Sequence, residues 1–154
     1  MHPEKNAFAN RLKALCELGC VPRSMLSHKI EMTPVDRCAE AILGLARMET
    51  KQTAYHVQNP HTVSLGQIIA ILEQSGCRIR VLSDNSFLKK VNQASKQGND
   101  TIITGVAGVK SAFLGSEKIK VTADTTLGLL SGSGFSWPFI DEAYIRDFLM
   151  CINK

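Results

Sequence analysis

Residues 28–48 read HKIEMTPVDRCAEAILGLARM, and this stretch sets the fold class because a short strand runs straight into a well-marked helix. We expect Lys29–Met32 to be extended. Thr33 is predicted as the helix N-cap, Pro34 as the first helical residue, and Asp36 as the capping-box partner of Thr33. Apolar residues then recur at intervals of three and four, which predicts a buried helix face. This face comprises Val35, Cys38, Ala39, Ile42, Leu45 and Ala46.

The same strand-to-helix order repeats along the chain. Ser64 and Gln67 form a second predicted capping box, which places a helix over 64–76 after a strand at Ala54–Val57. A half-exposed strand at 77–83 precedes a helix that ends near Gly98. An N-terminal helix is expected between Asn6, as its cap, and Gly19. Strands that alternate with helices favour an α/β fold with right-handed crossovers.

The C-terminal third contains one ambiguous segment and two predicted helices. Residues 101–115 are compatible with a strand and turn or with a helix followed by a loop. A strand is expected at 118–121, followed by a helix capped by Thr122 or Asp124. Asp141 is predicted to cap the last helix. We expect this helix to bury Tyr144, Ile145, Phe148 and Ile152.

Composition indicates one soluble, cytoplasmic domain. The 154 residues are 44% hydrophobic and 21% charged, without an apolar run long enough for a membrane span or a secretory signal. The five cysteines include no CxxC pair, which disfavours both a disulfide framework and a zinc site. We therefore expect small buried hydrophobic side chains at Cys16, Cys20, Cys38, Cys77 and Cys151.

The excess positive charge is concentrated in one stretch. The formal net charge is +4, and residues 76–98 contain one acid, Asp84, against five basic residues. These are Arg78, Arg80, Lys89, Lys90 and Lys96. A solvated face and an attractive surface for an acidic partner or a phosphate both explain this pattern. Aromatic residues are too sparse there to stack nucleic-acid bases.

The sequence lacks a self-contained set of catalytic residues. TGVAGVKS, at 104–111, has the wrong spacing for a phosphate-binding P-loop, and no GxGxxG dinucleotide motif occurs. Tyr55 and Tyr144 are each without a lysine four residues later that would lower the pKa of a catalytic phenol. We expect this chain to bind no cofactor or metal and to be inactive alone.

Four motifs nevertheless occur in the order seen in one family: NAFANRLKALCELGCVP, IEMTPVDRCAEAI, AYHVQNPHTVSLGQIIAILEQSG and VTADTTLGLLSGSGFSWPFID. Together they resemble the C-terminal part of the thioester reductase domains that terminate nonribosomal peptide synthetases, within the extended short-chain dehydrogenase/reductases. The resemblance implies a helix-rich α/β subdomain with a few short strands, spanning residues 1–154. The Rossmann region that binds NADPH and supplies the catalytic residues would precede it and is not in this chain.

The resemblance also implies a function and partners. Such an enzyme uses NADPH to release a peptide or acyl group from a phosphopantetheine-bearing carrier protein as an aldehyde or alcohol. The motifs align Asn6, Asn10, Thr33 and Asp36 with residues that line the substrate cleft. The basic residues Arg78, Arg80, Lys89 and Lys90 would steer an acidic carrier protein.

Further expectations concern the isolated chain. The resemblance implies that Trp137-Pro138 forms a structural corner before the last helix. Our candidate for the part that joins the larger sheet of a complete enzyme is the predicted strand Ala54–Val57. Without its Rossmann partner, the chain is expected to expose an apolar patch and to self-associate. Two alternatives remain open: a non-catalytic carrier-protein docking module, and the lid of a sugar-nucleotide epimerase or dehydratase.

Overall fold

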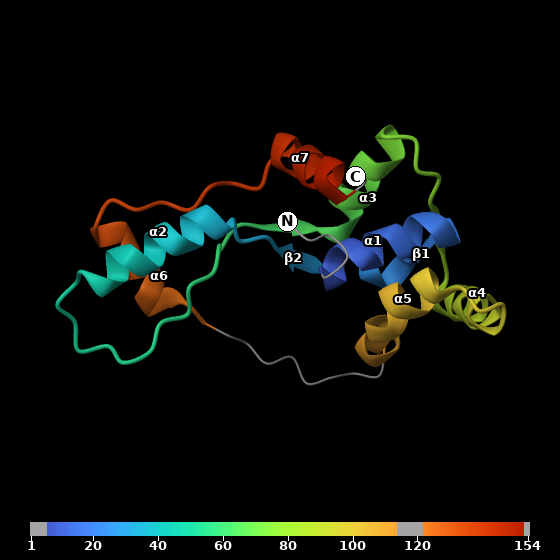
Figure 1. Cartoon of the computed structure of the whole chain (residues 1–154), viewed down its shortest axis with the longest axis horizontal. Helices are drawn as coiled ribbons and strands as arrows, with labels where there is room; N and C mark the ends of the chain where they lie inside the picture. Colours follow the sequence, from blue (N-terminus) through green and yellow to red (C-terminus); the bar gives the residue numbers. More distant parts are fainter. Residues whose placement is uncertain (1–5, 114–121, 153–154) are drawn as a thin grey trace. The chain divides into compact units, whose positions relative to one another are not determined.

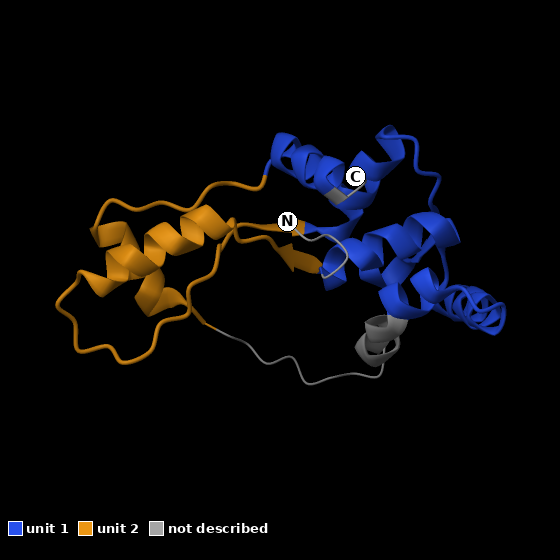
Figure 2. Ribbon diagram, in the orientation of Figure 1, with its two compact units in different colours: residues 1–28, 64–117, 141–154 blue, residues 29–63, 118–140 orange. Residues whose placement is uncertain are grey.

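The computed structural model describes residues 6–113 and 122–152, without the side chains of 107–113 and 152 (Figure 1). The structure contains two compact units built from interleaved segments (Figure 2), and the single subdomain over residues 1–154 stays a prediction. Unit 1 comprises residues 1–28, 64–117 and 141–154, and unit 2 comprises residues 29–63 and 118–140. The predicted helix-rich architecture with a few short strands is confirmed.

Unit 1 is mostly helical. Its helices are α1 (Ala7–Leu18), the 3-10 turn η2 (Arg23–Met25), α3 (Leu65–Gln74), α4 (Asp84–Lys96), α5 (Asp100–Phe113) and α7 (Glu142–Ile152). Strands β1 (Cys20–Pro22) and β4 (Arg80–Leu82) pair in parallel, with Cys20 opposite Arg80. Unit 2 contains β2 (Lys29–Glu31), α2 (Val35–Ala46), β3 (Thr62–Ser64) and α6 (Asp124–Gly132), and β2 and β3 form a second two-stranded sheet.

Local capping signals place most helix ends of unit 1 correctly. Asn6 Oδ1 accepts a hydrogen bond from the Ala9 N–H, and Gly19 ends α1 with φ 65°, a conformation that favours glycine. The Ser64–Gln67 capping box starts α3. Asp141 Oδ1 accepts from the Tyr144 N–H at the start of α7, as predicted. These ends need only residues close in sequence, which is why the sequence reveals them.

Helix α5 accounts for residues 101–113 of the ambiguous segment, since Asp100–Phe113 is helical and packs along α1, while residues 114 and 115 lie outside the described residues. The contact is closest at Gly105, which lies beside Asn10 and Ala14 of α1. A Cβ added at Gly105 would lie 2.5 Å from the Asn10 carbonyl oxygen and would overlap Ala14 Cβ. Glycine at 105 therefore permits this helix pair to approach closely.

We expect Gly105→Ala to lower the free energy of unfolding by about 2 kcal/mol, because the added methyl group pushes α5 away from α1. Gly128→Ala is the matched control, since Gly128 lies in α6 and has no atoms within 4 Å of an added Cβ. It should raise stability by about 0.5–1 kcal/mol through helix propensity. Urea unfolding of both variants measures the change in the free energy of unfolding. Equal changes in the two variants would contradict the close approach of α5 to α1 at Gly105.

The cysteines differ from their predicted role as buried hydrophobic residues. Cys16 and Cys77 form a disulfide with a Cα–Cα distance of 5.9 Å, across a sequence separation of 61 residues. Cys20 is buried as predicted, Cys38 is half-buried and Cys151 is exposed. The pairing was missed because it depends on β4 lying beside the end of α1, which the spacing of the cysteines does not reveal.

The side of α2 that faces the core overlaps the predicted face only at Cys38 and Leu45. Ala41 and Leu45 are buried with Leu130 and Trp137, and Cys38 and Met48 pack against them. In contrast, Val35, Ala39, Ile42 and Ala46 of the predicted buried face are exposed. Both sides of α2 carry apolar residues at helical spacing, and the position of the unit 2 core decides which one is buried.

The start of α2 also differs from the predicted capping box. Pro34 is the N-cap, and its carbonyl accepts a hydrogen bond from the Cys38 N–H. The Thr33 hydroxyl instead donates to Glu31 Oε1 at 2.7 Å and accepts from the Asn59 N–H. Thr33 is therefore committed to tertiary contacts, and the predicted Thr33–Asp36 capping box is wrong.

Three other predictions concern unit 2. The predicted strand Ala54–Val57 lies outside regular secondary structure, and the strand that forms is β3. Helix α6 begins after Ala123, which has no side-chain capping bond, so the predicted caps Thr122 and Asp124 are wrong. The predicted strand at 118–121 lies outside the described residues.

The C-terminal corner and last helix follow the predictions more closely. Trp137 is 7% exposed and packs edge-on against Phe135, with ring centroids 5.1 Å apart. In α7 the fully buried residues are Ile145 and Leu149, with Tyr144 and Phe148 half-buried; the side chain of Ile152 lies outside the description. Among the described helices, none is long and apolar enough to cross a membrane.

Candidate functional site

The two asparagines predicted to line a substrate cleft lie at the start of α1 in unit 1. Asn6 is half-buried and its side chain caps the helix, with 2.9 Å between Oδ1 and the Ala9 nitrogen. Asn10 is half-buried one turn later, and its carbonyl oxygen faces Gly105. The Asn6 side chain therefore has a structural role as a helix cap, and contact of either residue with substrate stays a prediction.

The other predicted pair, Thr33 and Asp36, lies at the entrance to α2 in unit 2. Thr33 is half-buried, and its hydroxyl is held by the bonds to Glu31 and Asn59 described above. Asp36 is exposed in the first helical turn, where its carboxylate interacts favourably with the helix dipole. Asp36 therefore exposes a carboxylate at the start of α2, whereas the Thr33 hydroxyl links the residues before α2 to Asn59.

Asn59 joins three segments of unit 2 through its side chain. Its side chain is 1% exposed, and Nδ2 donates to the carbonyls of Met32 at 3.2 Å and Pro138 at 3.0 Å. Its Oδ1 accepts from the His61 N–H. The His61 ring packs against the Phe139 ring at a tilt of 32°, with centroids 4.0 Å apart. Asn59 thus holds Met32, which precedes α2, close to the Trp137-Pro138 corner, because its side chain is hydrogen-bonded to both segments.

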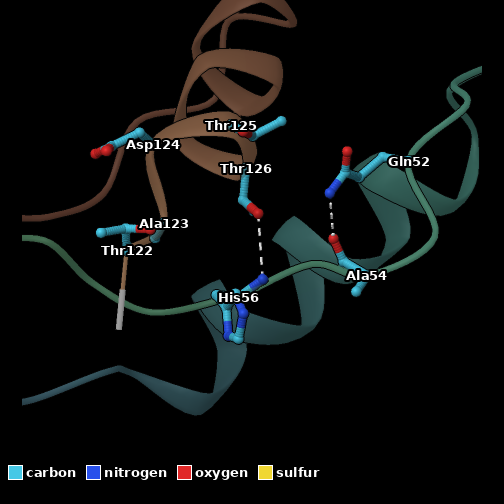
Figure 3. A pocket seen from close by; sticks show the side chains of 8 residues that line it. All are labelled: Gln52, Ala54, His56, Thr122, Ala123, Asp124, Thr125 and Thr126. Atoms are coloured by element: carbon cyan, nitrogen blue, oxygen red, sulfur yellow. Dashed lines mark hydrogen bonds between the residues drawn. The ribbon is translucent and has the colours of Figure 1, made fainter. Parts of the chain in front are cut away.

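An open polar pocket of about 440 Å³ lies between the segment 52–56 and the start of α6 (Figure 3). Thr126 Oγ1 points toward the main chain of His56 and accepts its N–H at 3.2 Å, and Gln52 Nε2 donates to the Ala54 carbonyl at 2.9 Å. The lining residues are Gln52, Ala54, His56, Thr122, Ala123, Asp124, Thr125 and Thr126.

This pocket can bind polar groups through its amide, hydroxyl, imidazole and carboxylate side chains. The sequence did not identify Gln52, His56 or Thr125 as residues that line a pocket, because the two segments meet only in the folded chain. Across residues 6–113 and 122–152, no cluster of three or more His, Cys, Asp and Glu side chains could hold a metal ion.

The predicted carrier-docking residues belong to unit 1 and are all exposed. Arg80 lies opposite Cys20 in the β1–β4 pair, and its N–H donates to the Gly19 carbonyl at 3.0 Å. The Arg78 carbonyl also borders Gly19. Burial raises the pKa of the Cys20 thiol, and the positive charge of Lys90 opposes that rise.

The fold therefore brings Arg78, Arg80 and Lys90 to the region around Gly19 and Cys20, although they come from β4, its approach and α4. Lys89 is the neighbouring residue on α4, turned by about 100° around the helix axis. We call the four residues Arg78, Arg80, Lys89 and Lys90 the basic surface. It is suited to attract an anionic partner, with a strength that falls as salt screens the charges.

Comparison with solved structures finds similarity along nearly the whole chain. A thiolation-reductase di-domain from an archaeal non-ribosomal peptide synthetase is 28% identical with a TM-score of 0.84, over 97% of this chain and 31% of that chain. The reductase domain of the aureusimine biosynthetic cluster is 23% identical with a TM-score of 0.79, over 98% of this chain and 39% of that one.

A third similar structure is the terminal R domain from the myxalamid PKS-NRPS biosynthetic pathway. It is 23% identical with a TM-score of 0.72, over 96% of this chain and 38% of that chain. This chain therefore spans less than two fifths of the length of each of these three structures. No protein-family model and no curated protein matches the sequence.

The fold is thus that of a reductase subdomain, rich in helices and with few short strands. More particularly, it matches the C-terminal subdomain of the terminal reductase domains of nonribosomal peptide synthetases. The resemblance deduced from the sequence motifs is confirmed.

Proposed function

We propose that this chain is the substrate-binding part of an NADPH-dependent thioester reductase. The complete enzyme would release a peptide or acyl group from its carrier protein as an aldehyde or alcohol. The observation that carries the proposal is the similarity over 97% of the chain to an archaeal reductase joined to a thiolation domain. Asn6, Asn10, Thr33 and Asp36 are the proposed substrate-side residues.

The residues of this chain do not fit a dinucleotide, so we assign NADPH binding to the remainder of the reductase. A dinucleotide site needs a glycine-rich turn between a strand and the start of a helix. The glycines of Ser131–Gly134 instead lie at the end of α6, followed by the loop to Phe135. Hydride transfer therefore belongs to the other part of the enzyme, while this chain would hold and orient the acyl group.

A fusion protein tests this assignment. The reductase segment of the archaeal di-domain that lies outside the aligned third is joined to this complete chain, and NADPH oxidation is followed with an acyl-phosphopantetheine thioester. We expect the fusion to reduce the thioester and this chain alone neither to bind NADPH nor to oxidise it. A fusion that folds and binds NADPH but reduces no thioester would overturn the proposed function.

The basic surface supports a role in carrier-protein binding, which also fits the alternative of a non-catalytic docking module. Its residues are exposed, and three of the four gather around Gly19 and Cys20. Carrier binding of this kind requires no catalytic group, only a positive surface that meets a negative one. The two functions differ in the fusion assay, because a docking module would bind the carrier without supporting reduction.

We expect Arg80→Glu combined with Lys90→Glu to slow association with the phosphopantetheinylated archaeal thiolation domain about tenfold at low salt. Lys51→Glu is the control, because this exposed lysine lies in unit 2, outside the basic surface. Stopped-flow association rates at two salt concentrations provide the measurement. Equal rates for the double variant and the control would exclude the basic surface as the docking site.

A further inference from the structure

The disulfide between Cys16 and Cys77 links the segments that lead into β1 and β4. Cys16 lies in the last turn of α1, shortly before β1, and Cys77 lies shortly before β4, with 5.9 Å between the two Cα atoms. This distance lies within the range that a disulfide requires. Both cysteines are half-buried, so a thiol from solvent can reach the bond. Accessible disulfides are reduced more readily than buried ones.

Strand β4 is short and largely exposed. It pairs with β1 in a two-stranded sheet, and each of these strands has three residues. Strand β1 is buried along its whole length, whereas Arg80 and Val81 of β4 are exposed. Ile79, just before β4, is buried. A pair of strands this short contributes little stability by itself, so the disulfide is a major constraint on the position of β4.

The disulfide also lies beside two residues of the basic surface. Arg78 directly follows Cys77, and Arg80 begins β4. The Arg80 N–H donates to the Gly19 carbonyl at 3.0 Å, and the Arg78 carbonyl borders Gly19 as well. The bond therefore holds the main chain of both arginines close to the end of α1.

The two lysines of the basic surface are held in a different way. Lys89 and Lys90 belong to α4, which packs against α1, α5 and β1. Phe87 and Val91 of the same helix are fully buried. The lysines therefore keep their positions whether or not the disulfide is intact, whereas the arginines depend on it.

We propose that the Cys16–Cys77 disulfide is a redox switch: its reduction by a low-molecular-weight thiol frees Arg78 and Arg80 from their positions beside Lys90 and weakens the basic surface as a docking site. A thiolate of the reductant bonds to one protein sulfur, and the other leaves as a thiolate when the S–S bond breaks. A second reductant thiolate attacks the reductant sulfur of this mixed disulfide, which releases the first cysteine and forms the reductant's own disulfide. Two electrons pass to the protein, and both cysteines take a proton from solvent.

The free cysteine nearest to Cys16 in the sequence does not compete for this bond. Cys20 is fully buried, and burial raises the pKa of its thiol, although the positive charge of Lys90 opposes that rise. A protonated thiol is a poor nucleophile, so Cys20 does not exchange with the disulfide. Oxidation therefore restores the same pair, as a reversible switch requires.

The effect on docking rests on the proposed function, in which the basic surface binds a carrier protein. Reduction leaves the number of positive charges unchanged, so the association rate should change little. The arginines lose their fixed positions, and ordering them again in the complex costs conformational entropy. We therefore expect the reduced protein to release the carrier about fivefold faster than the oxidised protein does.

Amide hydrogen exchange of this chain tests the switch without a carrier, well below the unfolding midpoint of the reduced protein. After reduction with glutathione, we expect residues 78–82 to exchange about tenfold faster while α3 stays protected, and oxidised glutathione should reverse the change. Cys16→Ser combined with Cys77→Ser should behave like the reduced protein. Cys151→Ser is the control and should respond like the native protein, because Cys151 is exposed and free.

Three results of this experiment would overturn the proposal. The first is a disulfide that glutathione does not reduce in the native protein. The second is unchanged exchange of residues 78–82 after reduction. The third is exchange that rises equally in α3, because the bond would then stabilise unit 1 as a whole without controlling the basic surface in particular.

Stopped-flow kinetics with the archaeal thiolation domain test the consequence for docking. The phosphopantetheine arm of this domain is acylated, so that its thiol cannot reduce the disulfide. We expect the reduced protein and the double serine variant to release the domain about fivefold faster than the oxidised protein, with similar association rates. Equal dissociation rates would overturn the proposal. Binding to neither form, together with the exchange response, would refute the proposed carrier role and support redox control of the arginines.

Discussion

Replacing both Cys16 and Cys77 with serine is expected to lower the free energy of unfolding by about 4 kcal/mol. The disulfide links residues 61 positions apart, and removing it releases that span of the unfolded chain from a closed loop. The bond also holds the end of α1 next to the residues that lead into β4. For a chain of this length, we expect the unfolding midpoint to fall by about 10 °C.

Calorimetry of the oxidised protein, the double variant and the protein treated with a reducing agent measures this effect. The last two should unfold at the same temperature. Cys151→Ser is the control, because Cys151 is exposed and free, and it should unfold like the oxidised protein. A reducing agent that leaves the midpoint unchanged, together with five titratable thiols in the native protein, would contradict the disulfide.

Trp137→Ala is expected to destabilise unit 2 by about 4 kcal/mol. Among the described residues, the indole packs in a small buried cluster with Ala41, Leu45 and Leu130, so its removal leaves a large cavity. The loss should appear as early unfolding of residues 29–63 and 122–140, which hydrogen exchange of their amides would detect.

The conservative variant separates ring packing from hydrogen bonding at this position. The Trp137 Nε1–H has no hydrogen-bond partner among the described residues. Trp137→Phe keeps most of the aromatic surface against Phe135, and we expect it to cost less than about 1.5 kcal/mol. A phenylalanine variant as unstable as the alanine variant would show that the indole N–H is bound in the native protein.

The candidate site was predictable only in part. The basic surface could be identified from sequence because its four residues lie within a stretch of thirteen. The roles of Asn59 and of the pocket at Thr126 could not, since each joins segments far apart in the chain. A buried asparagine can bind a ligand, or it can form hydrogen bonds with several parts of its own chain, as Asn59 does. The residue type alone does not distinguish these two roles.

The sequence by itself determined where α1, α3 and α7 begin, because the Asn6, Ser64 and Asp141 caps bond to groups within three residues. It also determined the family resemblance, through motifs that keep their order along the chain. Only the tertiary structure decided which side of α2 is buried, which cysteines pair, and that Ala54–Val57 lies outside regular secondary structure. These properties depend on which distant segment lies opposite each residue. Hydrophobic periodicity predicts which face of a helix or strand is apolar, but it does not predict which segment packs against that face.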